Sequence, residues 1–259
     1  MSLRIAFDLD GVLADMEAEL VRQTEILFGP AMTRVLQERA RSGQAAADST
    51  TTSAGGPGAP APAAQPPSTP DADGAPRLIQ LRMTGRQERR LWRHVQSIDG
   101  FWESLPEIEP GVVARLAALS AERRWEVIFL TKRPETAGAT AQVQTQRWLQ
   151  AHGFPLPSVF VVQGSRGRVA ESLALDFVVD DRPENCLDVM VDSRARAMLV
   201  WREDEKDLPV TVRRLGLGVV KSVEECLGIL SKVDAANQER PGLVDRMIRR
   251  LGFKEPASA

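Results

Sequence analysis

An alternation of short β-type runs with helical patterns is the strongest constraint on how this chain can fold. The β-type runs are Arg4–Leu9, Glu126–Thr131, Val159–Val162, Asp176–Asp180, Ala197–Trp201 and Gly218–Val220. Helical patterns mostly lie between or after them, at Val112–Glu122, Thr136–His152, Arg168–Leu173, Asn185–Asp192 and Val223–Val233. Alternation of this kind favours a parallel sheet with helices on both faces. We therefore predict an α/β fold.

A long insertion separates the first β-type run from the second. No Val, Ile, Leu, Met, Phe or Trp occurs from Gln37 to Arg77, so this stretch has little to bury in exchange for the entropy of ordering. Helical patterns flank it at Asp15–Arg41 and Leu78–Ser97. We expect a small α-helical cap inserted after the first strand. The predicted division is a catalytic core of residues 1–14 and 100–235, a cap of 15–99 with a disordered Pro/Ala/Gly-rich loop at 42–76, and a C-terminal amphipathic helix and tail at 236–259.

Composition narrows the classes of partner. Lys and Arg number 33 and Asp and Glu 35, for a net charge of −2 in 259 residues, so no general attraction to a nucleic-acid polymer or to anionic lipid is expected. No apolar run approaches the roughly 18–20 residues that span a bilayer, and no signal peptide is expected. Cys186 and Cys226 lie far apart without neighbouring metal ligands, which favours a reducing, cytoplasmic setting. The sequence contains no indication of oligomeric state.

Carboxylates follow two of the predicted strands. Asp8 and Asp10 point to the same side because side chains alternate along a strand, and Gly11 permits a sharp exit from it. Asp180 and Asp181 end another strand, and ligands bind at this edge of parallel sheets. Clustered carboxylates repel one another unless protonated or bound to a cation. Mg²⁺, with one or two carboxylates and a substrate phosphate as ligands, is the expected occupant.

These motifs resemble those of the haloacid dehalogenase-like phosphohydrolase superfamily. The resemblance rests on Asp8-Leu9-Asp10-Gly11-Val12, then Thr131 after an apolar strand, then Asp180-Asp181 after another. It covers about residues 3–15 and 100–201 and implies a Rossmann-like parallel sheet.

Three sequence segments are similar, more loosely, to the 5′-nucleotidase and deoxyribonucleotidase branch of that superfamily. They are Asp8–Asp15, Phe101–Ile108 and Asp180-Asp181-Arg182-Pro183. In that branch, aromatic side chains near the junction of cap and core lie against the nucleobase. The resemblance therefore implies that Phe101 and Trp102 contact the substrate.

The superfamily resemblance also implies catalytic roles. Asp8 would attack phosphorus to form an aspartyl-phosphate, and Asp10 would protonate the leaving oxygen and then activate water. Thr131 would hydrogen-bond the transferring phosphoryl group. Mg²⁺ would be held by Asp8, Asp10 through its main-chain carbonyl, and Asp180, with Asp181 in support.

One part of the family pattern is altered. The family usually places a lysine at the start of the helix before the strand that ends in Asp180, and this region contains none. Counting back from Asp180, Arg166 occupies the matching place, with Arg168 a close second and Lys132 a third candidate cation. Arginine can bind phosphate through two parallel hydrogen bonds but is bulkier than lysine.

The function expected from the resemblance is Mg²⁺-dependent hydrolysis of a small phosphorylated metabolite, with a nucleoside monophosphate as the expected substrate. Two alternatives stay open. One is a sugar- or polyol-phosphate phosphatase, and the other is a weakly catalytic or inactive phospholigand-binding protein, which the missing lysine suggests.

Overall fold

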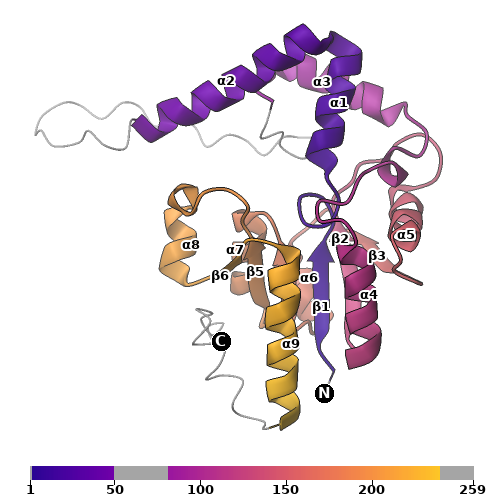
Figure 1. Ribbon diagram of the computed structural model, residues 1–259, viewed down its shortest axis with the longest axis vertical. Coiled ribbons are helices and arrows are strands. Elements are labelled where there is room, and N and C mark those ends of the chain that lie inside the picture. The colour runs from indigo at the N-terminus through magenta and orange to yellow at the C-terminus, as the bar shows by residue number, and fades with distance from the viewer. Residues whose placement is uncertain (1, 50–80, 240–259) are drawn as a thin grey trace, which may run out of the picture. The chain divides into compact units, whose positions relative to one another are not determined.

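A computed structural model describes residues 2–49 and 81–239, with residues 41–49 and 238–239 described by their backbone alone. Its centre is a six-stranded sheet in the order β3-β2-β1-β4-β5-β6, and every neighbouring pair is parallel (Figure 1). The strands are β1 Arg4–Asp8, β2 Glu126–Thr131, β3 Ser158–Val161, β4 Phe177–Asp180, β5 Arg196–Val200 and β6 Gly218–Val220. The predicted α/β fold with a parallel sheet is confirmed.

Helices cover both faces of this sheet. They are α4 Val112–Arg123, α5 Ala141–Ala151, α6 Arg166–Ser172, α7 Pro183–Asp192, α8 Val210–Leu215 and α9 Val223–Glu239. Helices α4 and α9 lie side by side on one face (Figure 1). On the other face one apolar cluster joins the sheet to α6, α7 and α8, and its members include Ala6, Val178, Leu199, Ala170, Val189 and Val212. Alternate residues of the central strands thus enter opposite halves of the core.

Several boundaries differ from those expected. Helix α6 begins at Arg166 because Ser165 caps it, its hydroxyl accepting from the Arg168 N–H at 3.1 Å. Helix α8 follows Pro209 and was not expected from the sequence. Helix α9 continues to Glu239, and the predicted C-terminal amphipathic helix lies almost wholly outside the described residues.

The helical insert after β1 is confirmed. Glu17–Phe101 and Lys132–Gly138 form a compact unit distinct from the sheet and its flanking helices. Its helices are α1 Met16–Phe28, α2 Pro30–Ser49 and α3 Gly85–Gln96. Gly29, with φ of 84°, and Pro30 break the helical pattern expected across 15–41 into two helices. Helical backbone continues to Ser49, beyond residue 42 where the loop was expected to begin, and residues 50–80 lie outside the described part of the chain.

Within this insert, Gln23 of α1 makes polar contacts with its own helix and with α3. The Gln23 side chain donates to Glu19 Oε1 at 2.7 Å, and Gln23 Oε1 lies 3.0 Å from His94 Nε2. Thr84 and Gln87 form a capping box at the start of α3. In neither of the described ranges, 2–49 and 81–239, is a helix both long and apolar enough to cross a bilayer.

Candidate active site

The end of β1 forms a tight turn. Leu9 O accepts hydrogen bonds from the Leu13 and Ala14 N–H groups at 2.9 and 2.8 Å. Gly11 has φ of 86°, and a Cβ at this position would lie 2.0 Å from Asp181 Oδ2. Only glycine therefore allows the chain after β1 to pass this close to the end of β4.

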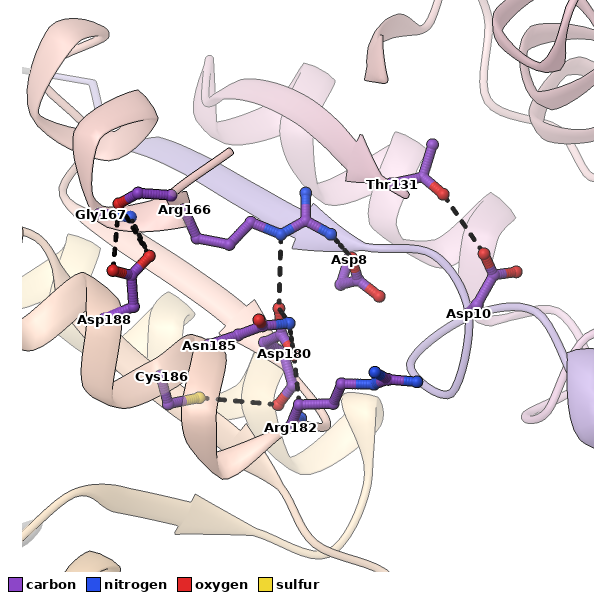
Figure 2. Close-up of polar contacts among 11 residues, drawn as sticks. Asp8, Asp10, Thr131, Arg166, Gly167, Asp180, Arg182, Asn185, Cys186 and Asp188 are labelled. Atoms are coloured by element: carbon purple, nitrogen blue, oxygen red, sulfur yellow. Dashed lines mark hydrogen bonds and ion pairs between the residues drawn. The ribbon is translucent and has the colours of Figure 1, made fainter. Parts of the chain in front are cut away.

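Three carboxylates meet where β1 and β4 end side by side. Oxygen atoms of Asp8, Asp180 and Asp181 all lie within 4.8 Å of one another. Asp8 and Asp180 are buried, with 7% and 1% of their surface exposed. Asp180 accepts from the Arg182 N–H at 2.9 Å and from Asn185 Nδ2 at 3.0 Å, and these bonds orient its carboxylate (Figure 2).

Burial and mutual repulsion act on all three groups. Burial raises the pKa of Asp8 well above its usual range, although the Arg166 charge opposes this. Burial also raises the pKa of Asp180, and burial together with the Asp180 charge raises that of Asp181 to about 7. In addition, Asp181 Oδ1 is buried without a hydrogen-bond partner. Full ionisation of these three carboxylates is unfavourable without a counter-charge, and one of their oxygens has no hydrogen-bond partner. Both features fit the binding of a divalent cation that prefers oxygen ligands.

Arg166 lies next to this cluster, as the spacing from Asp180 predicted. Its Nη2 donates to Asp8 Oδ1, and its Nε forms an ion pair with Asp180 Oδ2 at 3.9 Å (Figure 2). Only 2% of its surface is exposed, and Nη1 has no hydrogen-bond partner in the structure. A buried guanidinium with a free N–H edge beside Asp8 is suited to binding an anion.

The other two candidate cations are placed differently. The Arg168 side chain is 84% exposed, and its Nε lies 3.7 Å from Asp192 Oδ2 on α7. Lys132 is half-buried and belongs to the insert's unit rather than to the sheet. Of the three, the structure brings Arg166 together with Asp8.

Thr131 and Asp10 form a second pair of site residues. Thr131 ends β2, and its hydroxyl donates to Asp10 Oδ2 at 3.3 Å (Figure 2). Asp10 is partly exposed, in contrast to Asp8. Its carboxylate is not among those that lie within 4.8 Å of one another, although its charge acts on Asp8 and Asp181. This arrangement leaves Asp10 accessible to a leaving group or to water.

Phe101 and Trp102 have no exposed surface. The Trp102 N–H donates to Gln144 Oε1 at 3.1 Å. Neither ring presents a face to solvent, so contact with a nucleobase requires a change that exposes them. Their role in substrate binding stays a prediction.

Sequence reasoning did not single out Arg202. Its guanidinium donates to Gly11 O at 2.6 Å, to Val12 O at 3.1 Å and to Glu109 at 2.7 Å. Glu109 in turn accepts from the Val223 and Glu224 N–H groups at the start of α9. Arg202 therefore secures the turn that carries Asp10. No local pattern reveals this, because Gly11, Val12 and Glu109 lie 191, 190 and 93 positions away in the chain.

Comparisons with known proteins found similar chains among solved structures, at low sequence identity. No family model and no curated protein matches the sequence. A haloacid dehalogenase-like hydrolase from Burkholderia xenovorans is 13% identical, with a TM-score of 0.46, over 90% of this chain and 98% of its own. A Thermotoga maritima protein assigned as a beta-phosphoglucomutase is 19% identical, with a TM-score of 0.48, over 89% and 99%.

A haloacid dehalogenase-like family hydrolase from Xanthomonas campestris is 13% identical, with a TM-score of 0.45, over 92% of this chain and 95% of its own. At such identities and TM-scores, activity has to be inferred from the chain's own residues.

Proposed function

We propose that this protein is a Mg²⁺-dependent phosphomonoester hydrolase that acts through an aspartyl-phosphate. The observation that carries the proposal is the convergence of Asp8, Asp180 and Asp181 within 4.8 Å, with Arg166 bound to Asp8. Acidic clusters are common, but here the carboxylates are mostly buried and a cation already contacts the expected nucleophile. This combination supports a site built for an anion and a metal together.

In the first step an oxygen of Asp8 attacks phosphorus. The bond from phosphorus to the ester oxygen breaks, and Asp10 gives its proton to the departing alcohol. In the second step Asp10 takes a proton from water, whose oxygen attacks the phosphorus of the aspartyl-phosphate. The bond to Asp8 breaks, and inorganic phosphate is released. The partly exposed position of Asp10 suits both proton transfers.

The other residues bind and orient. Asp8, Asp180 and Asp181, with the main-chain carbonyl of Asp10, would hold Mg²⁺, which when bound neutralises charge on the phosphoryl oxygens and on Asp8. The Arg166 guanidinium would bind a phosphoryl oxygen through its free edge. Thr131 would donate its hydroxyl hydrogen bond to the phosphoryl group in place of Asp10.

We further propose nucleoside monophosphates as the substrates, on the resemblance of Phe101–Ile108 to the nucleotidase branch. A sugar or polyol phosphate is the second candidate, favoured by the complete burial of Phe101 and Trp102. A site that stacks a nucleobase needs an accessible aromatic face, whereas a site for a sugar phosphate does not. A panel of nucleotides and sugar phosphates, compared by kcat/KM, separates the two.

The central test is hydrolysis of an aryl phosphate with and without Mg²⁺. We expect Mg²⁺-dependent turnover that Asp8→Asn removes, because the amide is nearly isosteric but a poor nucleophile. Asp204→Asn, at an exposed carboxylate, is the matched control and should keep full activity. Turnover by Asp8→Asn at the wild-type rate contradicts the mechanism. Binding of phosphate without hydrolysis by the wild type supports instead an inactive phospholigand-binding protein.

A further inference from the structure

Asp188, on α7, contacts the residues on both sides of Arg166. The Ser165 hydroxyl donates to the Asp188 carboxylate, whose oxygens lie 3.0 and 2.9 Å away. The Gly167 N–H donates to Asp188 Oδ2 at 3.0 Å (Figure 2). One carboxylate thus contacts the residues immediately before and after Arg166, through the Ser165 hydroxyl and the Gly167 backbone.

The two helices approach closely at this point. A Cβ added to Gly167 would lie 2.3 Å from the Asp188 carbonyl oxygen and 2.6 Å from Asp192 Cβ. Gly167 is buried, so α7 packs directly against the first turn of α6. The absence of a side chain at Gly167 is what brings the Asp188 carboxylate within reach of its N–H.

The same helix also holds the metal-binding side of the cluster. Asn185 precedes Asp188 by three positions, which places both on one face of α7. Asn185 donates to both oxygens of Asp180 at 3.0 Å. Helix α7 therefore positions Asp180 through Asn185 and the α6 turn through Asp188, and the Arg166 guanidinium spans the distance between Asp180 and Asp8.

We propose that Asp188 is a positioning residue for catalysis, which holds Arg166 at Asp8. This inference rests on the proposed phosphatase function. Arg166 has a long side chain with several rotatable bonds, and its guanidinium stays in one place only if its backbone does. Without Asp188, the Gly167 N–H loses its acceptor and the Ser165 hydroxyl keeps as its acceptor only Asp192 Oδ2 at 3.4 Å, so Arg166 loses its fixed approach to the nucleophile. The cost falls on turnover, because Arg166 acts on the group being transferred.

A purely structural role for Asp188 makes a different prediction, and a double-mutant cycle separates the two. We would measure kcat and KM for an aryl phosphate with Mg²⁺ in the wild type, Asp188→Ala, Arg166→Ala and the double variant. We expect Asp188→Ala to lower kcat about 10- to 100-fold, as for other small displacements of a reacting group. In the Arg166→Ala background the same substitution should lower kcat less than twofold, because nothing is left for Asp188 to position.

Glu171→Ala is the matched control. Glu171 lies on α6, the helix that carries Arg166. Like that of Asp188, its carboxylate accepts a backbone N–H, that of Arg194 at 3.1 Å, but this bond involves neither neighbour of Arg166. It should keep kcat near the wild-type value. Asp188→Asn retains one acceptor oxygen and should give an intermediate kcat. Asp188→Asn replaces the alanine variant throughout if that variant fails to fold by circular dichroism.

Two results overturn the inference. One is wild-type kcat in Asp188→Ala, and the other is a loss in the double variant equal to the product of the two single losses. If the wild type has no phosphatase activity, the proposed function fails separately. In that case the positioning role of Asp188 is tested by calorimetric titration with inorganic phosphate. Weaker phosphate binding in both Asp188→Ala and Arg166→Ala supports the positioning role. Equal phosphate affinity in the wild type and Asp188→Ala overturns it.

Discussion

The metal-free protein should lose stability as the pH rises from about 4 to about 7, and Mg²⁺ should restore it. The pKa of Asp181 is raised from its usual 3.8 to about 7 by burial and by the neighbouring Asp180 charge. Between those two pH values the folded state holds more protons than the unfolded state. Raising the pH therefore lowers the free energy of unfolding. Asp8 and Asp180 have raised pKa values as well and contribute with the same sign.

The size of the effect follows from Asp181. A difference of about three between its pKa values in the folded and unfolded states corresponds to about 4 kcal/mol of unfolding free energy. Water reaches part of this side chain, so about 4 kcal/mol is an upper bound for Asp181 alone. Asp181→Asn removes this titration and one oxygen ligand. It should therefore flatten the pH profile by up to that amount and also reduce the stabilisation by Mg²⁺.

The assay is urea unfolding followed by tryptophan fluorescence at a series of pH values, in EDTA and again with saturating Mg²⁺. Asp204→Asn removes an exposed carboxylate and is the control, with a profile close to that of the wild type. Parallel pH profiles for the wild type and Asp181→Asn in EDTA would refute the reasoning. So would a wild-type stability that rises with pH between about 4 and 7.

Three further predictions concern single substitutions. Arg166→Ala should lower kcat about 10²- to 10³-fold and Arg168→Ala less than about twofold, so equal effects in a steady-state assay would contradict the placement of Arg166 at Asp8. Gly11→Ala should lower kcat about 10²-fold or more and weaken Mg²⁺ binding measured by calorimetry, because the alanine Cβ would overlap Asp181 Oδ2. Unchanged kcat and Mg²⁺ affinity would show that the turn can move aside. Trp102→Ala should lower the free energy of unfolding by about 3–5 kcal/mol, since the ring is fully buried. If Trp102 also contacts a base, KM should rise about tenfold for nucleoside monophosphates and not for a base-free phosphate; equal changes for both leave it a packing residue.

Much of the sheet was predictable because its strands are apolar and short. Strands β2 and β6 have the predicted bounds, β1 and β4 differ by one residue at one end, and β3 and β5 are shifted by one residue at both ends. Parallel strands buried on both faces carry continuous apolar runs, and this pattern is local. The position of Arg166 was also predictable, because only the short helix α6 and a connection separate it from Asp180.

Tertiary contacts account for what the sequence did not reveal. From the sequence pattern, Asp188 is an ordinary acidic residue of a predicted helix. The role that we propose for it depends on the close approach of α6 at Gly167. From the sequence, Arg202 is an arginine that follows a strand, with no sign of a partner. Its partners Gly11 and Val12 lie 191 and 190 positions away in the chain. The break between α1 and α2 did have a local signal, Gly29-Pro30, which punctuates a helix wherever it occurs.

The central position of β1 has a consequence for folding kinetics. Its neighbours pair Arg4 with Glu126 on β2 and Ile5 with Phe177 on β4, so its partners lie 122 and 172 positions along the chain. Contacts of such long range slow folding, because a large loop must close before they form. At about 5–20 residues per second, a ribosome needs roughly 10–35 s to add the residues between β1 and β4. The strand that carries Asp8 therefore has no partner until β2 has been made, and its β4 side stays unpaired and exposed to chaperones and proteases until β4 has been made as well.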